Sequence, residues 1–146
     1  MRIAVVGRNA DALCRAADVD AACFRSLSEA SGVAWNLLAL TRSAAAHRSV
    51  GELYAQNVLL PGDTPSALAA SLRAQQAVGY GLSARDTLTF SGFSGTGRQL
   101  CLQRSVLTLG NALLEPQELP LSPAFAALTD EDALLAAGLR LLCRGL

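Results

Sequence analysis

The fold of this chain is constrained most by a repeated order of short apolar run, turn and helix signal. The clearest runs span residues 2–6 (RIAVV), 35–41 (WNLLALT) and 57–60 (NVLL), and glycine, proline or a polar residue follows each of them. A continuous apolar run between turn residues is typical of a strand that is covered on both faces. Strands that alternate with helices favour βαβ units, which build a parallel sheet with right-handed crossovers.

The elements expected before residue 86 continue this order. They are a strand at 2–6, a helix at 10–17, a weaker strand at 21–27, a strand at 35–41, an alanine-rich helix that ends near residue 54, a strand at 57–60, a helix at 65–76 and a strand at 77–80. Thr64 is expected to cap the helix that begins at Pro65, where the missing N–H of proline does no harm. Leu68 and Leu72 lie four residues apart, on one face of that helix.

After residue 85 the pattern changes to an alternation of polar and apolar residues. Residues 87–91 (TLTFS) alternate, and the glycine-rich stretch 91–97 (SGFSGTG) is typical of a hairpin or a bulge. Gly110-Asn111 has the residue types of a two-residue hairpin turn. We therefore expect an antiparallel β-meander of two or three strands, whose last arm is limited by Pro116 and Pro120.

The end of the chain carries two helix starts. Ser122 precedes a proline, and Thr129 precedes three acids, which suit the N-terminal end of a helix dipole. The sequence therefore predicts an α/β fold in a single domain, residues 1–146. It consists of a Rossmann-like parallel sheet of four or five strands (1–85), extended by the antiparallel β-meander (86–121), with the C-terminal helices (122–146) packed on the sheet.

The chain contains no lysine, since all twelve of its basic residues are arginine. A GxxxxGK[ST] phosphate loop and Schiff-base catalysis both need a lysine, so both are excluded. His47 is the single histidine, which excludes metal sites built on two histidines. It could serve as a general acid or base, but a lone histidine in a short helix is more often a solvated surface residue. We predict no cofactor and no metal.

Other catalytic motifs are incomplete. The turn after the first strand (Gly7-Arg8-Asn9) keeps only the first glycine of a GxGxxG dinucleotide loop. Residues 92–95 (GFSG) miss the GxSxG nucleophile elbow by one residue. Without a complete catalytic constellation, the interpretation leans away from an enzyme.

The cysteines and the hydropathy indicate the compartment. The four cysteines (Cys14, Cys23, Cys101, Cys143) include no CxxC pair, so they are interpreted as small core hydrophobes in a reducing cytosol. No run approaches 18 apolar residues, and the first apolar run is too short for a signal peptide. We expect a cytoplasmic protein that contacts no membrane.

The low charge content bears on partners. Charged residues make up 16% of the chain, and the formal net charge is zero, whereas about 25% charge is usual. The shortfall favours a surface that is covered by a protein partner or by a second copy of the chain, although GC-rich coding explains it equally. The apolar arm at residues 106–121 is the expected contact surface. Nucleic-acid binding is not expected, because the arginines are scattered and form no basic stripe.

A ligand would sit beyond the carboxyl ends of the parallel strands. Four loops are expected to meet there, at residues 7–9, 41–43, 62–64 and 81–83. A small anionic ligand would contact Arg42, and a carboxylate would accept from a ribose hydroxyl or bind a metal. The alternatives are structural, since glycine ends strands, Thr-Pro begins helices and aspartate is common in turns. The candidate ligand-binding residues are Asn9, Arg42, Asp63, Thr64, Tyr80 and Asp86.

Residues 57–91 resemble the end of the central domain of Mur ligases. The resemblance is carried by NVLLPGDTP at residues 57–65, then a helix, then AVGYGLSARDTLT at residues 77–89. It implies a similar local fold and a degenerate nucleotide-like pocket. Ligase activity is not implied, because the family's nucleotide loop needs GK[ST] and Gly62 replaces the first aspartate of its Asp-Asp turn. As a whole, the chain resembles small bacterial proteins, which implies no function.

Two functions remain open from the sequence. The first is a cytoplasmic binding or assembly module that self-associates. The second is a protein that binds a small or nucleotide-like molecule, with or without catalysis, at the ends of the parallel strands.

Overall fold

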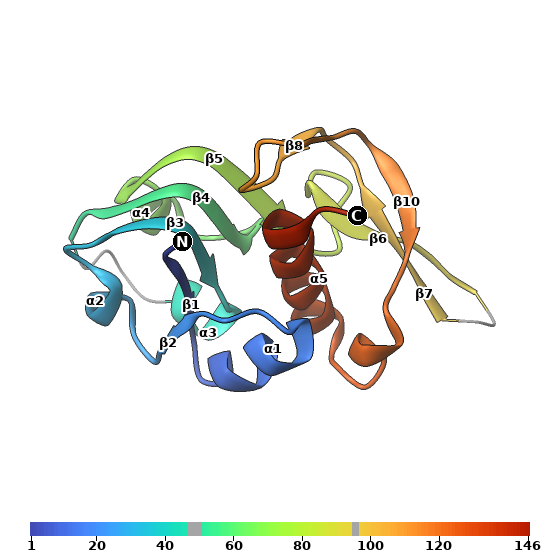
Figure 1. Cartoon of the computed structure of the whole chain (residues 1–146), viewed down its shortest axis with the longest axis horizontal. Helices are drawn as coiled ribbons and strands as arrows, with labels where there is room; N and C mark the ends of the chain where they lie inside the picture. Colours follow the sequence, from blue (N-terminus) through green and yellow to red (C-terminus); the bar gives the residue numbers. More distant parts are fainter. Residues whose placement is uncertain (47–50, 95–96) are drawn as a thin grey trace.

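Eight strands form one mixed sheet in the computed structural model, which describes residues 1–46, 51–94 and 97–146 (Figure 1). The strand order across the sheet is β10-β7-β6-β5-β4-β3-β1-β2. The bounds of these strands are β1 Ile3–Val6, β2 Ala22–Phe24, β3 Ala34–Leu40, β4 Leu53–Pro61, β5 Leu72–Tyr80, β6 Leu88–Ser94, β7 Gly97–Leu102 and β10 Gln117–Pro120.

The first six strands make the parallel part. Strand β1 lies between β2 and β3, and β4 and β5 continue in chain order beyond β3. Strand β6 joins β5 in parallel through a single register pair, Tyr80 with Leu88. The parallel sheet is therefore wider than the four or five strands expected. The carboxyl ends of β1, β3, β4 and β5 lie at one edge, so the four predicted loops do meet there.

The strands after residue 85 are mainly antiparallel, as predicted. Strands β6 and β7 pair antiparallel with a register shift between Phe90 and Gly92, and β10 pairs antiparallel with β7. The turn expected at 94–97 falls partly on residues 95 and 96, which lie outside the described part of the chain. Strands β8 (Val106–Leu107) and β9 (Leu113–Leu114) form a separate hairpin. Its connection is longer than the predicted two residues.

Helices cover both faces of the parallel strands. Alternate residues of β3 divide between two cores: Leu37 and Ala39 pack with α1 (Ala10–Ala17) and α5 (Asp130–Arg144). Leu38 and Leu40 pack with the short helices α2 (Leu27–Ala30), α3 (Arg42–Ala45) and α4 (Ser66–Ala69). The long helix α5 crosses the face of the sheet, with α1 beside it (Figure 1). The predicted C-terminal helix is therefore confirmed, and a 3-10 turn at Pro123–Phe125 precedes it.

Two helix predictions were wrong in extent. The helix expected at 65–76 ends at Ala69, and residues 72–76 belong to β5. Residues 72–76 form a strand because β5 pairs with β4 along its full length. This long-range pairing overrides the helical spacing of Leu68 and Leu72. Thr64 is not the cap, because Pro65 occupies that position. The alanine-rich helix expected up to residue 54 is α3, which ends at Ala45, and β4 begins at Leu53.

The weaker strand expected at 21–27 is β2, which spans only three residues, and Leu27 already belongs to α2. None of the helices in the described ranges has both the length and the apolar composition that a membrane span requires.

Candidate functional site: a polar cleft at the ends of β4 and β5

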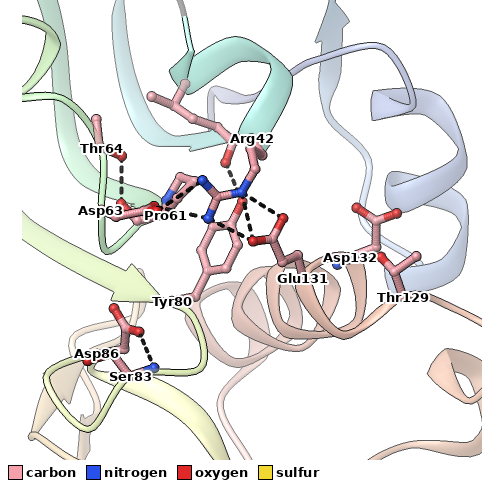
Figure 2. Close-up of polar contacts among 11 residues, drawn as sticks. Arg42, Pro61, Asp63, Thr64, Tyr80, Ser83, Asp86, Thr129, Glu131 and Asp132 are labelled. Carbon is pink, nitrogen blue, oxygen red and sulfur yellow. Dashed lines mark hydrogen bonds and ion pairs between the residues drawn. The ribbon is translucent and has the colours of Figure 1, made fainter.

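A polar cleft with a volume of about 590 Å³ contains most of the predicted site residues. It opens beyond the carboxyl ends of β4 and β5, and the first turn of α5 closes one side of it (Figure 2). Its size falls within the roughly 300–1,000 Å³ of small-molecule sites. The lining residues are Arg42, Gly62, Asp63, Tyr80, Gly81, Leu82, Ser83, Arg85, Asp86 and Glu131.

Arg42 is held between two carboxylates that come from different elements. Its Nη1 and Nη2 donate to the two oxygens of Asp63 at 3.1 and 3.0 Å, and its Nε donates to Glu131 at 2.7 and 2.8 Å. The paired geometry toward Asp63 matches the planar fork of a guanidinium. Arg42 thus joins the start of α3, the loop after β4 and the first turn of α5 (Figure 2).

This arrangement fixes the protonation states of the pair. The hydrogen bonds from Arg42 hold the pKa of the Asp63 carboxyl below its ordinary value. The same contact, with that to Glu131, raises the pKa of the Arg42 guanidinium. Both groups are charged at neutral pH. Because the side chains of Arg42 and Asp63 are 50% and 69% exposed, water screens the ion pair and its contribution to stability is small.

Asp86 forms the floor of the cleft. The residue is 6% exposed, and its Oδ2 accepts from the N–H of Ser83 at 3.0 Å. Two glycines make room for the carboxylate: a Cβ on Gly62 would lie 1.6 Å from Oδ1, and one on Gly81 would lie 2.5 Å from Oδ2. Within the described residues, no hydrogen bond to Oδ1 is formed by the protein, so this oxygen is free to accept from a ligand.

Tyr80 lines the cleft with its ring, whereas its hydroxyl is used in a hydrogen bond within the fold. The hydroxyl donates to the carbonyl oxygen of Leu40 at 2.8 Å, and the residue is 2% exposed. Burial raises the pKa of this phenol. Tyr80 therefore shapes the wall of the cleft.

Asn9 and Thr64 lie outside the cleft. Asn9 Nδ2 donates to Asp132 Oδ2 at 3.0 Å, which ties the start of α1 to α5. Thr64 Oγ1 donates to the carbonyl oxygen of Pro61 at 2.6 Å and closes the turn after β4. Four of the six candidate residues, Arg42, Asp63, Tyr80 and Asp86, are thus brought together.

The crevice between the loops after β1 and β3 is filled by Thr41. A Cβ on Gly7 would lie 1.8 Å from Thr41 Oγ1, so the two loops are in close contact. Thr41 Oγ1 also hydrogen-bonds Ser43 Oγ at 2.9 Å. The open space lies instead further along the sheet, next to β4 and β5.

Glu131 is the functional residue that the sequence did not reveal. The sequence indicates Glu131 only as one of the acids in the first turn of a helix. In the structure it accepts a hydrogen bond from Arg42, which is 89 residues away in the chain. The first-turn acids mark the residue type, but only the packing of α5 shows which of them enters the cleft. His47, the other acid–base candidate, lies outside the described residues.

The charges of the lining indicate what the cleft can bind. Three carboxylates face two guanidinium groups, and Arg42 is already neutralised by two of the carboxylates. An anion at Arg42 would have to replace one of them. Hydroxyl or ammonium donors, in contrast, find acceptors at Asp86, Asp63 and Glu131. In the described ranges, no group of three or more histidines, cysteines or acids has the arrangement of a metal site.

Comparison with protein-family models, with curated proteins and with solved structures found no match to this chain.

Proposed function

We propose that this protein is a non-catalytic binding module whose small-molecule ligand occupies the cleft at the ends of β4 and β5. The observation that carries the proposal is the Asp86 carboxylate, which is almost fully buried at the floor of a cleft of ligand size and keeps one oxygen free. No buried side-chain oxygen of the described residues lacks a partner, so Oδ1 is not an unsatisfied buried atom. A ligand donor at Oδ1 would take the place of water in the cleft.

The ligand class follows from the same lining. It is a polar molecule with hydroxyl or ammonium groups that donate to Asp86 and Asp63. Arg85 is exposed at the rim, where its guanidinium can meet a negative group at the other end of the ligand. A nucleoside or an α-amino acid has both features, and the nucleoside agrees with the nucleotide-like pocket that the resemblance to Mur ligases implies.

The strand order supports a site of this kind. The run β2-β1-β3-β4-β5 is an order found in doubly wound parallel sheets, which bind ligands beyond the carboxyl ends of their strands. The usual place in this order is the crevice between β1 and β3, which Thr41 fills here, so the strand order supports the edge of the sheet and the cleft itself gives the position next to β4 and β5. We interpret the parallel half as Rossmann-like on this basis, in a cytoplasmic protein as the sequence predicts.

Native mass spectrometry of freshly purified protein is the first test, followed by thermal unfolding with nucleosides, sugars and α-amino acids at millimolar concentration. A retained small molecule, or a rise in Tm with one ligand class, is expected. The proposal fails if the protein retains no mass and no compound raises its Tm.

The substitution Asp86→Asn tests the floor of the cleft. An asparagine can keep its oxygen toward the N–H of Ser83 and turn its NH₂ toward the cleft, so an acceptor becomes a donor with little change of shape. The ligand-induced rise in Tm should fall by most of its value in Asp86→Asn and in Asp63→Ala. It should persist in the control Glu115→Gln, at an exposed acid outside the cleft. An unchanged rise in both variants would remove these carboxylates from the site.

A second candidate function, self-association, is favoured by one observation. Leu107 and Leu113 are directly paired across the β8–β9 hairpin and are 47% and 60% exposed. They lie within the arm that the sequence predicts as a contact surface. We propose a second copy of the chain as the partner, and sedimentation at micromolar concentration tests this: monomer alone would contradict it.

A further inference from the structure

Two thiols of different elements lie in contact, away from the polar cleft. Cys14 Sγ of α1 is 3.4 Å from Cys23 Sγ of β2. A disulfide bond is about 2.05 Å long, so a closer approach of about 1.4 Å would join the two sulfurs. At this distance the two sulfur atoms are in direct contact, and either thiol can donate a weak hydrogen bond to the other.

The surroundings allow both movement and access. Strand β2 is at the edge of the sheet and spans three residues, and among the described strands it pairs with β1 alone, so few backbone hydrogen bonds oppose a shift toward α1. Next to the sulfurs is a cleft of about 390 Å³, whose lining includes both cysteines together with Asp11 and Arg15. Cys14 is 7% exposed and Cys23 is partly exposed, so a small oxidant reaches Cys23 first.

We propose that Cys14 and Cys23 form a reversible disulfide that fastens α1 to the edge strand β2. This site is independent of the ligand cleft. The oxidant is a low-molecular-weight disulfide such as glutathione disulfide. The Cys23 thiolate attacks it and releases one glutathione thiolate, and Cys14 then displaces the second from the mixed disulfide. Two thiol hydrogens and two electrons leave the protein, and one S–S bond forms for the one that is broken.

The chemical surroundings make this exchange slow at neutral pH. Burial, together with the contact with Cys14 and the nearby Asp11, raises the pKa of the Cys23 thiol to about 12. Burial also raises the pKa of the Cys14 thiol, whereas the hydrogen bond with Cys23 lowers it; Asp11 and Cys143 act in the direction of burial and Arg15 acts against it. Since the thiolate is the nucleophile, the rate should rise about tenfold for each pH unit between about pH 7 and pH 9.

The chain is well suited to the experiment that tests the proposal. Trypsin can cut only after arginine here, and each cysteine falls in its own peptide: residues 9–15, 16–25, 99–104 and 141–144. The reduced protein is equilibrated at about pH 9 in glutathione buffers of increasing oxidised fraction, alkylated and digested. The expected product is peptide 9–15 linked to peptide 16–25, with the other two cysteines alkylated and the linkage reversed by dithiothreitol.

Matched variants decide between outcomes. Cys101→Ser, on β7 and away from the pair, should leave the linkage unchanged, whereas Cys23→Ser should abolish it and leave Cys14 alkylated. Peptide mapping of the protein without substitutions does not depend on whether any variant folds. Four alkylated cysteines in the most oxidising buffer would overturn the proposal. A link between peptides 9–15 and 141–144, which would join Cys14 to Cys143, would do so as well.

Discussion

At the scale of single residues, Gly62 and Gly81 act by leaving space rather than by their backbone conformation. Neither has the positive φ that strains other residues, yet a Cβ at either position would collide with the Asp86 carboxylate. The sequence predicts these glycines only as residues that end strands. Their role depends on Asp86, which the fold brings next to them, so local sequence patterns could not reveal it.

The substitution Gly62→Ala should therefore destabilise the protein. The added methyl would lie 1.6 Å from Asp86 Oδ1, so the carboxylate must leave its position. We expect a loss of roughly 1–3 kcal/mol in the free energy of unfolding, as for other overpacked sites, measured by urea denaturation. Gly92→Ala is the matched control, since a Cβ there meets nothing within 4 Å. Equal stability of the two variants would mean that Asp86 moves freely.

At the scale of elements, the first turn of α5 is fixed by its cap. Thr129 Oγ1 accepts from the N–H of Asp132 at 3.3 Å, and three acids follow in the first turn. These signals are local, so the sequence predicts the start of α5 correctly. The segment after Pro65 is the opposite case, since its helix was predicted too long. Pairing with β4 makes residues 72–76 a strand, and no local sequence pattern indicates that pairing.

Removing the cap should weaken both the helix and the cleft. Thr129→Ala leaves an N–H of α5 without its partner, which should lower the free energy of unfolding by about 1 kcal/mol. Glu131 lies in the same turn and holds Arg42, so fraying should also loosen that contact. Thermal unfolding compares Thr129→Ala with Thr129→Ser, which keeps the hydroxyl and should resemble the unmodified protein. Similar losses in both variants would argue that the methyl group matters rather than the hydrogen bond.

At the scale of the whole molecule, the position of the polar cleft was predictable but its full set of lining residues was not. Parallel strands bring their carboxyl ends to one edge, and this rule placed Arg42, Asp63, Tyr80 and Asp86 together. The rule gives no information on Glu131, because the path of α5 across the sheet is set by packing. Gly138, for example, lets α5 approach Leu59 and Leu88 closely enough that a Cβ would lie 2.9 Å from the Leu59 side chain. Such fit between distant side chains leaves no periodic signal in the sequence.

Self-association should depend on the exposed leucine pair of the β8–β9 hairpin. Covering one exposed leucine contributes about 1.5–3 kcal/mol, and a buried charge in its place opposes contact. In a symmetric dimer the substitution acts twice, so Leu113→Glu should raise the dissociation constant at least roughly tenfold. Sedimentation velocity across a concentration series measures this constant.

Leu82→Glu is the matched control for that change. Leu82 is 61% exposed, almost the same as Leu113, but it lies at the polar cleft and away from the hairpin. It should leave the dissociation constant of the dimer unchanged, and it should affect ligand binding instead. Equal weakening of the dimer by both substitutions would show that general surface hydrophobicity drives association. A selective effect of Leu113→Glu would place the contact on the hairpin, which leaves the cleft open in the assembled protein.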